Sequence, residues 1–168
     1  MKLLLTSGGI KNPTIKDALV GILGKPVGEC NALFIPTVLE LTALPSIGAD
    51  RWVPWVREAD VLLVDGGEAM YLWVGMSAGS MVMTPRIGDS FVNWPAAEGD
   101  QTLGVVDFSI FPHLDYPDWP DNTLASARQW ATKIPGPAYA IDDETAISVV
   151  DGAVEVVSEG HWELLNSG

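Results

Sequence analysis

The chain has 168 residues, 22 of them acidic and 9 basic, so its formal net charge at pH 7 is −13. Hydrophobic residues make up 48% and charged residues 18%, which excludes a disordered polyelectrolyte and indicates a compact globular protein. At this length we expect one domain over residues 1–168. Nucleic acid and acidic membranes would repel the negative charge, and no basic cluster in the sequence offsets it, so neither is expected as a partner.

The chain offers little for targeting, disulfides or metal binding. The apolar run Leu3–Leu5 is too short for the core of a signal peptide or for a membrane span, so we expect a cytoplasmic protein. Cys30 is the only cysteine, which excludes an intramolecular disulfide and a zinc site built on several thiolates. We predict no metal and no cofactor. Seven tryptophans leave room for an apolar interface, as in a homodimer.

The N-terminal quarter of the chain reads as a strand followed by a helix. Residues 3–6 are predicted to form a buried strand. Asn12 is a good N-cap, and Pro13 suits the first helical position. Apolar residues then recur at positions 15, 18, 19 and 22 before Gly24, which predicts an amphipathic helix that ends there.

The rest of the chain continues the α/β pattern. Strands are predicted at 32–35, 38–41 and 61–64, and the last is almost wholly apolar, as in a parallel sheet covered on both faces. Asp121 is the predicted N-cap of a second helix with apolar residues at 124, 127, 130 and 131. Asp151-Gly152, between strands at 146–150 and 153–157, predicts a C-terminal β-hairpin. These elements indicate an α/β domain with a mainly parallel sheet.

Two connections are too short for this architecture. Parallel neighbouring strands need a crossover of about a dozen residues or more. The strand that ends near Thr37 runs directly into Val38, and too few residues separate Asp65 from the strand that begins at Val74. We therefore expect connecting segments to be missing from the chain after Thr37 and after Trp73.

The strongest chemical signal is the sequence Gly75-Met76-Ser77-Ala78-Gly79. A strand that runs into G-x-S-x-G is typical of a nucleophile elbow, in which a sharp turn before a helix exposes the serine hydroxyl. The backbone N–H of Ala78 would then face the oxyanion of a tetrahedral intermediate. Gly66 or Gly67, after the strand at 61–64, could supply a second N–H.

A nucleophilic serine needs a base, and the chain has two histidines. His113 follows an apolar segment and is the candidate base, with a buried structural histidine as the alternative. His161 lies in a polar turn, where a solvated side chain needs no special role. The orienting acid stays open: Asp142, Asp143 and Glu144 end a predicted strand, and Asp89 and Asp115 are nearer in sequence to Ser77 and His113.

Several segments together carry a family resemblance. Leu5-Thr6-Ser7-Gly8-Gly9, Val64-Asp65-Gly66-Gly67, the segment around Ser77, Phe111-Pro112-His113 and Ile141–Ala146 resemble, in this order, the peptidase E family of serine peptidases. The resemblance implies a three-layer sandwich with a mainly parallel central sheet, like that of class I glutamine amidotransferases and flavodoxin, and a kinship with cyanophycinases. It also implies Ser77 as nucleophile, His113 as base and Asp143, or Glu144 beside it, as the acid.

The chain also departs from the family pattern. Glu68 stands where the family usually has asparagine, and the family acid is usually glutamate where this chain has Asp143. Family members carry a longer segment at the first short connection and a helix at the second. Their favoured substrates are short peptides with an N-terminal aspartate, which would need a cation in the pocket. Arg86 and Arg128 are candidates, although neither lies in a matching motif.

Three functions remain open on the sequence. The first is a dipeptidase-like serine peptidase that cuts small peptides through an acyl-enzyme. The second is a serine esterase or amidase that uses the same site on a non-peptide substrate. The third is a non-catalytic, amidotransferase-like binding module, because a fold alone does not establish a function.

Overall fold

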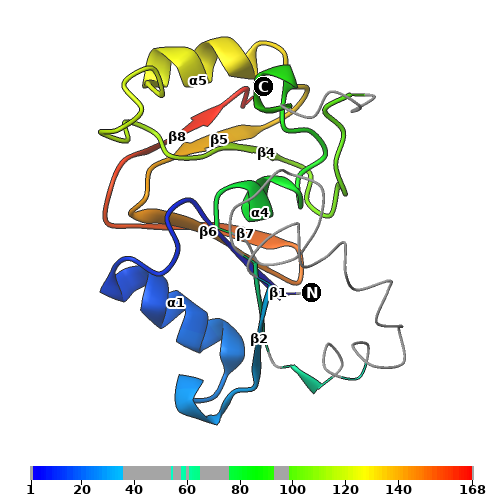
Figure 1. The fold of residues 1–168 in the computed structure, drawn as a ribbon, viewed down its shortest axis with the longest axis vertical. Coiled ribbons are helices and arrows are strands. Elements are labelled where there is room, and N and C mark those ends of the chain that lie inside the picture. Colours follow the sequence, from blue (N-terminus) through cyan, green and yellow to red (C-terminus); the bar gives the residue numbers. More distant parts are fainter. Residues whose placement is uncertain are drawn as a thin grey trace.

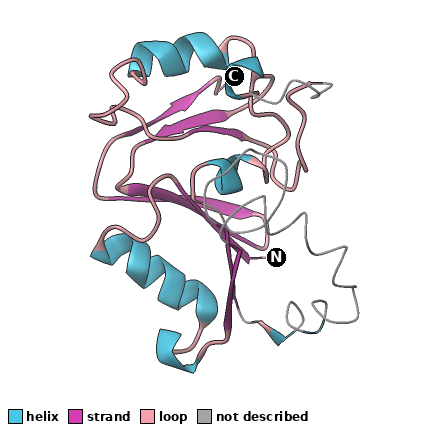
Figure 2. Ribbon diagram, viewed as in Figure 1, coloured by secondary structure: helices cyan, strands magenta, loops and turns pink. Residues whose placement is uncertain are grey.

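The computed structural model describes residues 2–35, 54, 58–59, 61–64, 76–92 and 99–167. Figures 1 and 2 show their arrangement. The strands are β1 (Lys2–Thr6), β2 (Ala32–Ile35), β3 (Val61–Val64), β4 (Ser109–Phe111), β5 (Ala138–Ile141), β6 (Thr145–Val150), β7 (Ala153–Ser158) and β8 (Trp162–Leu165). The helices are α1 (Pro13–Leu23), α4 (Ala78–Met81) and α5 (Leu124–Ala131), with 3₁₀ turns at Val27–Glu29 and Asp89–Phe91.

The described strands form three small sheets. Their strand orders are β1-β6-β7, β2-β3 and β4-β5-β8. The pairs β2–β3 and β4–β5 are parallel, whereas β1–β6, β6–β7 and β5–β8 are antiparallel. The protein is therefore a mixed α/β structure, as the alternation of strands and helices predicts.

The mainly parallel sheet expected from the sequence is not confirmed in the described ranges. The physical reason lies in the C-terminal third of the chain. The predicted hairpin over Asp151-Gly152 is present, and a two-residue turn can join only antiparallel strands. Its first strand, β6, then runs antiparallel beside β1, and β8 returns antiparallel to β5.

Helices cover the outer faces of the two three-stranded sheets. On β1-β6-β7, Ile15 of α1 packs against Leu4 and Ala146. On β4-β5-β8, Ala127 and Trp130 of α5 pack against alternate residues of the strands, with α4 lying between the two sheets (Figure 2). The main core fills the space between the sheets and comprises Leu3, Leu5, Val82, Met83, Val106, Phe108, Ile110, Ile141, Ile147 and Val149.

The predicted start and end of α1 are confirmed. The Asn12 side chain accepts a hydrogen bond of 2.8 Å from the Ile15 N–H, and Pro13 occupies the first turn. Gly24 ends the helix with φ +71°, a conformation that glycine adopts without a Cβ clash. The second predicted helix is also present, but its N-cap is Thr123 and not Asp121, because the Thr123 hydroxyl is the group that accepts from Ser126 N–H.

Some expectations fall outside the described residues. They are the strand at 38–41 and the two short connections after Thr37 and Trp73. In the part of the chain that the structure describes, no helix is long and apolar enough to cross a membrane.

An ion pair between a buried carboxylate and a partly exposed guanidinium fixes the segment that follows α4. The carboxylate of Asp100 is 4% exposed, and Arg86 donates to it from Nε at 2.9 and 3.1 Å and also from Nη2. The Gly88 N–H donates to the same carboxylate at 3.0 Å. Next to it, the Trp130 indole N–H donates to the carbonyl of Ile87 at 2.8 Å, which ties this segment to α5.

Hydrogen bonds from Arg86 hold the pKa of Asp100 below its ordinary value. A carboxyl with a depressed pKa stabilises the fold above its unfolded pKa of about 3.9, and this contribution is lost as the pH falls through the folded pKa. We expect Asp100→Asn to lower the free energy of unfolding by about 1–2 kcal/mol at pH 7, an amount reduced by the partly exposed Arg86.

Thermal unfolding between pH 7 and pH 3 tests this expectation. The difference between wild type and Asp100→Asn should shrink as the pH falls below about 4. Asp17→Asn, on the exposed face of α1, is the matched control and should unfold like the wild type at each pH. A deficit of Asp100→Asn that does not change with pH would contradict the role of the ionised carboxylate.

Candidate active site

Ser77 lies on the sharp turn that the G-x-S-x-G pattern predicts. Met76 forms a parallel bridge with Thr6 at the end of β1, and α4 begins directly after Ser77. The backbone of Ser77 has φ 57° and ψ −118°, a region that costs a non-glycine residue about 1–3 kcal/mol. Its N–H points at the carbonyls of Thr6 and Ser7, at 3.1 and 3.0 Å, which holds the strained turn against β1.

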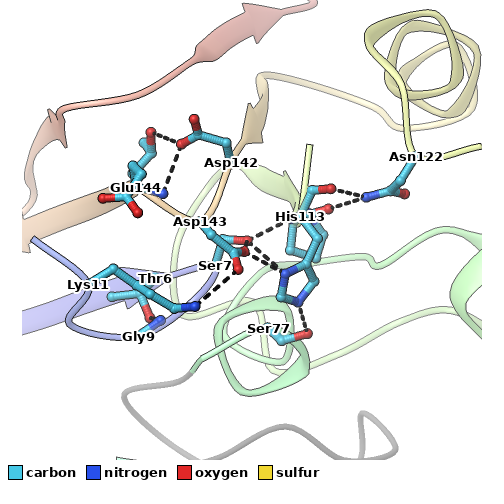
Figure 3. A network of polar contacts seen from close by, with 12 residues as sticks. Thr6, Ser7, Gly9, Lys11, Ser77, His113, Asn122, Asp142, Asp143 and Glu144 are labelled. Carbon is cyan, nitrogen blue, oxygen red and sulfur yellow. Dashed lines mark hydrogen bonds and ion pairs between the residues drawn. The ribbon is translucent and has the colours of Figure 1, made fainter. Parts of the chain in front are cut away.

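His113 lies beside Ser77, two residues after β4. Its Nε2 is 2.7 Å from the Ser77 hydroxyl, and its side chain is 13% exposed (Figure 3). The backbone of His113 is left-handed, with φ 57°. The Asn122 side-chain amide donates to the carbonyls of Pro112 and His113, and the Leu114 N–H donates to the carbonyl of Ile141 at 3.0 Å. These bonds fix the loop that carries the imidazole.

The carboxylate of Asp143 lies at the other nitrogen of the imidazole. Asp143 Oδ1 is 2.7 Å from His113 Nδ1, and its side chain is 18% exposed. Asp143 stands between β5 and β6, where the chain passes from one three-stranded sheet to the other. The structure therefore brings together the three side chains that the resemblance implies, in the order serine hydroxyl, imidazole, carboxylate.

The other candidate acids are engaged elsewhere. Glu144 accepts from the Asn12 side chain at 3.0 Å, next to the start of α1. Asp142 accepts hydrogen bonds from the N–H groups of Glu144 and His161, so it orders its own turn. Asp115 is 3.2 Å from the second histidine, His161, and both side chains are about half exposed. Asp89 opens an exposed 3₁₀ turn after α4.

The loop after β1 belongs to the site, although sequence reasoning assigned it no role. Ser7 is fully buried, and its hydroxyl lies 3.0 Å from Asp143 Oδ1. Gly8 packs flat against the same side chain, because a Cβ there would lie 2.6 Å from Asp143 Cγ. Lys11 Nζ is 3.6 Å from Asp143 Oδ2. The signal was present in the Ser7-Gly8-Gly9 segment, which is part of the family resemblance, but a serine and two glycines after a strand also suit an ordinary turn.

Two aromatic rings flank the imidazole. The centroid of Trp119 lies 4.8 Å from that of His113, edge to face, and Tyr116 lies 5.9 Å away. Trp119 is 51% exposed, so its ring contacts the imidazole and also faces solvent. Sequence reasoning missed both residues, because nothing in their local pattern links them to His113.

The groups expected around the substrate are only partly described. Ala78 is the first residue of α4, so its N–H has no acceptor inside the helix. Gly66 and Gly67, the expected second donors, lie outside the described residues. Arg86 pairs with Asp100, and Arg128 pairs with Glu163 at 2.9 Å, so neither candidate cation contacts the three side chains.

Within the described ranges, no group of three or more histidine, cysteine, aspartate or glutamate side chains could hold a metal ion. The chemistry available at the site is that of a hydroxyl, an imidazole and a carboxylate in series.

Known proteins share both the sequence pattern and the fold. The model of peptidase family S51 matches residues 57–157, more than half of the chain. A candidate peptidase E protein from Listeria monocytogenes EGD-e is 19% identical with a TM-score of 0.66, and the match covers 95% of this chain and 98% of that one. A peptidase from an acI-B1 Actinobacterium is 15% identical with a TM-score of 0.58, over 97% of this chain and 89% of that one.

No curated protein sequence matches the chain. At identities of 19% and 15%, the two solved structures establish the shared fold, and the family model establishes the membership. The chain therefore belongs to peptidase family S51 and is a serine-type peptidase.

Proposed function

We propose that this peptidase hydrolyses small peptides, as a dipeptidase-like enzyme, through an acyl-enzyme formed on Ser77. The observation that carries the proposal is the pair of 2.7 Å contacts that links Ser77 Oγ to His113 Nε2 and His113 Nδ1 to Asp143 Oδ1. This series of groups can activate a hydroxyl that is otherwise a weak nucleophile.

Each residue has a defined part in the reaction. Ser77 attacks the scissile carbonyl while His113 Nε2 takes the hydroxyl proton and later delivers it to the leaving amine. Asp143 keeps the Nδ1 proton of the imidazole in place and stabilises the imidazolium that forms. A water activated by His113 then attacks the acyl-enzyme, releases the acid product and restores Ser77.

Backbone donors stabilise the oxyanion in this proposal. The Ala78 N–H follows the nucleophile directly and has no acceptor within α4. It can therefore donate a hydrogen bond to the oxyanion as negative charge develops there. Gly66 or Gly67 remains our proposed source of the second N–H. Donors of this kind typically contribute about 10²–10³-fold to kcat.

The side chains that border the site suggest which substrates it accepts. Lys11 is 47% exposed, and an ion pair of that exposure is weak, so its ammonium can turn from Asp143 to a substrate carboxylate. This favours Lys11, rather than Arg86 or Arg128, as the cation for a peptide with an N-terminal aspartate. The exposed face of Trp119 offers an apolar wall for the rest of a short peptide.

A second candidate function is hydrolysis of a non-peptide ester or amide by the same residues. The same 2.7 Å contacts support it, because acyl transfer to Ser77 can expel an alcohol or a simple amine as well as the amine of a peptide. A dipeptide library separates the two functions: cleavage of dipeptides favours the first, and turnover of simple esters alone favours the second.

Removal of the nucleophile or the base tests the mechanism. We expect Ser77→Ala and His113→Ala each to lower kcat by at least about 10³-fold, with little further loss in the double variant, because the residues act as a unit. A fluorophosphonate probe should label the wild type at Ser77. His161→Ala, the other histidine, is the control and should keep wild-type turnover. Wild-type hydrolysis by Ser77→Ala would rule out the serine mechanism.

The acid is tested by a matched pair of amide substitutions. Asp143→Asn should lower kcat by about 10²–10⁴-fold, since the amide cannot stabilise the imidazolium. Glu144→Gln should leave kcat within about twofold, because Glu144 bonds to Asn12 and lies away from the imidazole. If Glu144→Gln removes activity and Asp143→Asn does not, Glu144 is the acid.

Substrate charge is tested at Lys11. We expect Lys11→Met, which keeps most of the side-chain length, to raise KM about tenfold for dipeptides with an N-terminal aspartate and to leave KM for neutral dipeptides unchanged. Arg128→Met is the control, because Arg128 pairs with Glu163 away from the site. An equal rise in KM for acidic and neutral dipeptides would contradict a role in charge recognition.

A further inference from the structure

We infer that Ser7 is a positioning residue that holds the His113–Asp143 pair and the Ser77 turn together; this inference rests on the proposed function. Ser7 contacts all three of these residues. Its hydroxyl is 3.0 Å from Asp143 Oδ1 and 2.6 Å from the backbone nitrogen of His113, and its carbonyl is 3.0 Å from the backbone nitrogen of Ser77.

The direction of each hydrogen bond follows from the donors available. A serine hydroxyl has one proton to donate and two lone pairs to accept with. The His113 N–H can only donate, so it occupies a lone pair of Ser7 Oγ. The single hydroxyl proton then goes to the Asp143 carboxylate, because His113 Nδ1, at 3.3 Å, already has its partner in the same carboxylate at 2.7 Å.

This arrangement orients the imidazole in two ways. Asp143 Oδ1 accepts from both Ser7 Oγ and His113 Nδ1, so the carboxylate cannot rotate without breaking two bonds (Figure 3). With the proton on Nδ1, the lone pair of Nε2 is directed at the Ser77 hydroxyl. Ser7 Oγ also accepts a hydrogen bond from the backbone N–H of His113. This bond restrains the left-handed backbone of His113, where φ is 57°.

Two other residues of the loop after β1 also lie against the Asp143 side chain. Lys11 contacts the second oxygen, Oδ2, at 3.6 Å, and Gly8 packs against the Cβ and Cγ of Asp143. Lys11 is half exposed, whereas Ser7 is fully buried. A buried hydroxyl with fixed partners restrains the carboxylate more firmly than an exposed, flexible ammonium.

Substitution of Ser7 distinguishes positioning from simple packing. We expect Ser7→Ala to lower kcat about 10–100-fold with KM within about twofold, because small misplacements of catalytic groups cost rate and not binding. Ser7→Thr keeps the hydroxyl and should recover most of this loss despite its extra methyl group. If Ser7 only fills space, Ala should be the better replacement, and that order would overturn the inference.

The matched control is Ser109→Ala. Ser109 is also buried, and its hydroxyl donates one hydrogen bond, to the carbonyl of Arg86 at 2.8 Å, away from the proposed triad. Melting temperatures of all variants are measured, and kinetics are run where each is folded. Ser109→Ala should keep wild-type kcat; a loss equal to that of Ser7→Ala would mean that any buried serine has this effect, and would overturn the inference.

A double-mutant cycle gives a second measurement that does not depend on the threonine variant. In the Asp143→Asn background, Ser7→Ala should lower kcat by less than about twofold, because the pair that Ser7 holds is already disabled. Full additivity would overturn the inference. Failure of the proposed function gives a different result, because Ser77→Ala would then remain active. If Ser77→Ala is inactive, the proposed function holds, and the kinetics of the Ser7 variants alone test the role of Ser7.

Discussion

The site depends on one hydrogen bond, between His113 Nδ1 and Asp143 Oδ1, that joins two sheets at the point where their ends meet. His113 follows β4 in one three-stranded sheet, and Asp143 lies two residues before β6 in the other. The core between the sheets sets their separation, so apolar packing far from solvent determines whether these two side chains meet. The antiparallel pairing of β6 with β1 matters for the same reason, because it sets where β6 begins and therefore where Asp143 lies.

Much of this could be predicted from the sequence where the signal is local. Asn12 and Gly24 bound α1, and Asp151-Gly152 marks the hairpin, because caps and turns depend on a few adjacent residues. The sheet pairing could not be predicted, since β1 and β6 lie far apart in the chain and their hydrogen bonds leave no local pattern. The same limit applies to Ser7, whose partners are 106 and 136 residues away.

Hydrogen bonds hold each of the two strained backbone positions in the site. Ser77 and His113 both have a positive φ, which residues other than glycine rarely adopt. The Ser77 turn is tied to the backbone at the end of β1, and the His113 loop is tied to Asn122. The sequence predicted the first of these strained positions, because small residues surround Ser77. It contained no such signal at His113, where the side-chain amide of Asn122 takes the place of a glycine-rich turn.

The close approach of Gly8 to Asp143 has an evolutionary consequence. Any residue with a Cβ at position 8 would collide with the carboxylate, at 2.6 Å from Cγ, so the two positions cannot change independently. A lineage that replaced Gly8 would first have to move its acid to another place on the β5–β6 connection or lengthen that side chain to reach the imidazole by a different route. The glycine thus restricts which acids this scaffold can recruit, although it has no functional side chain of its own.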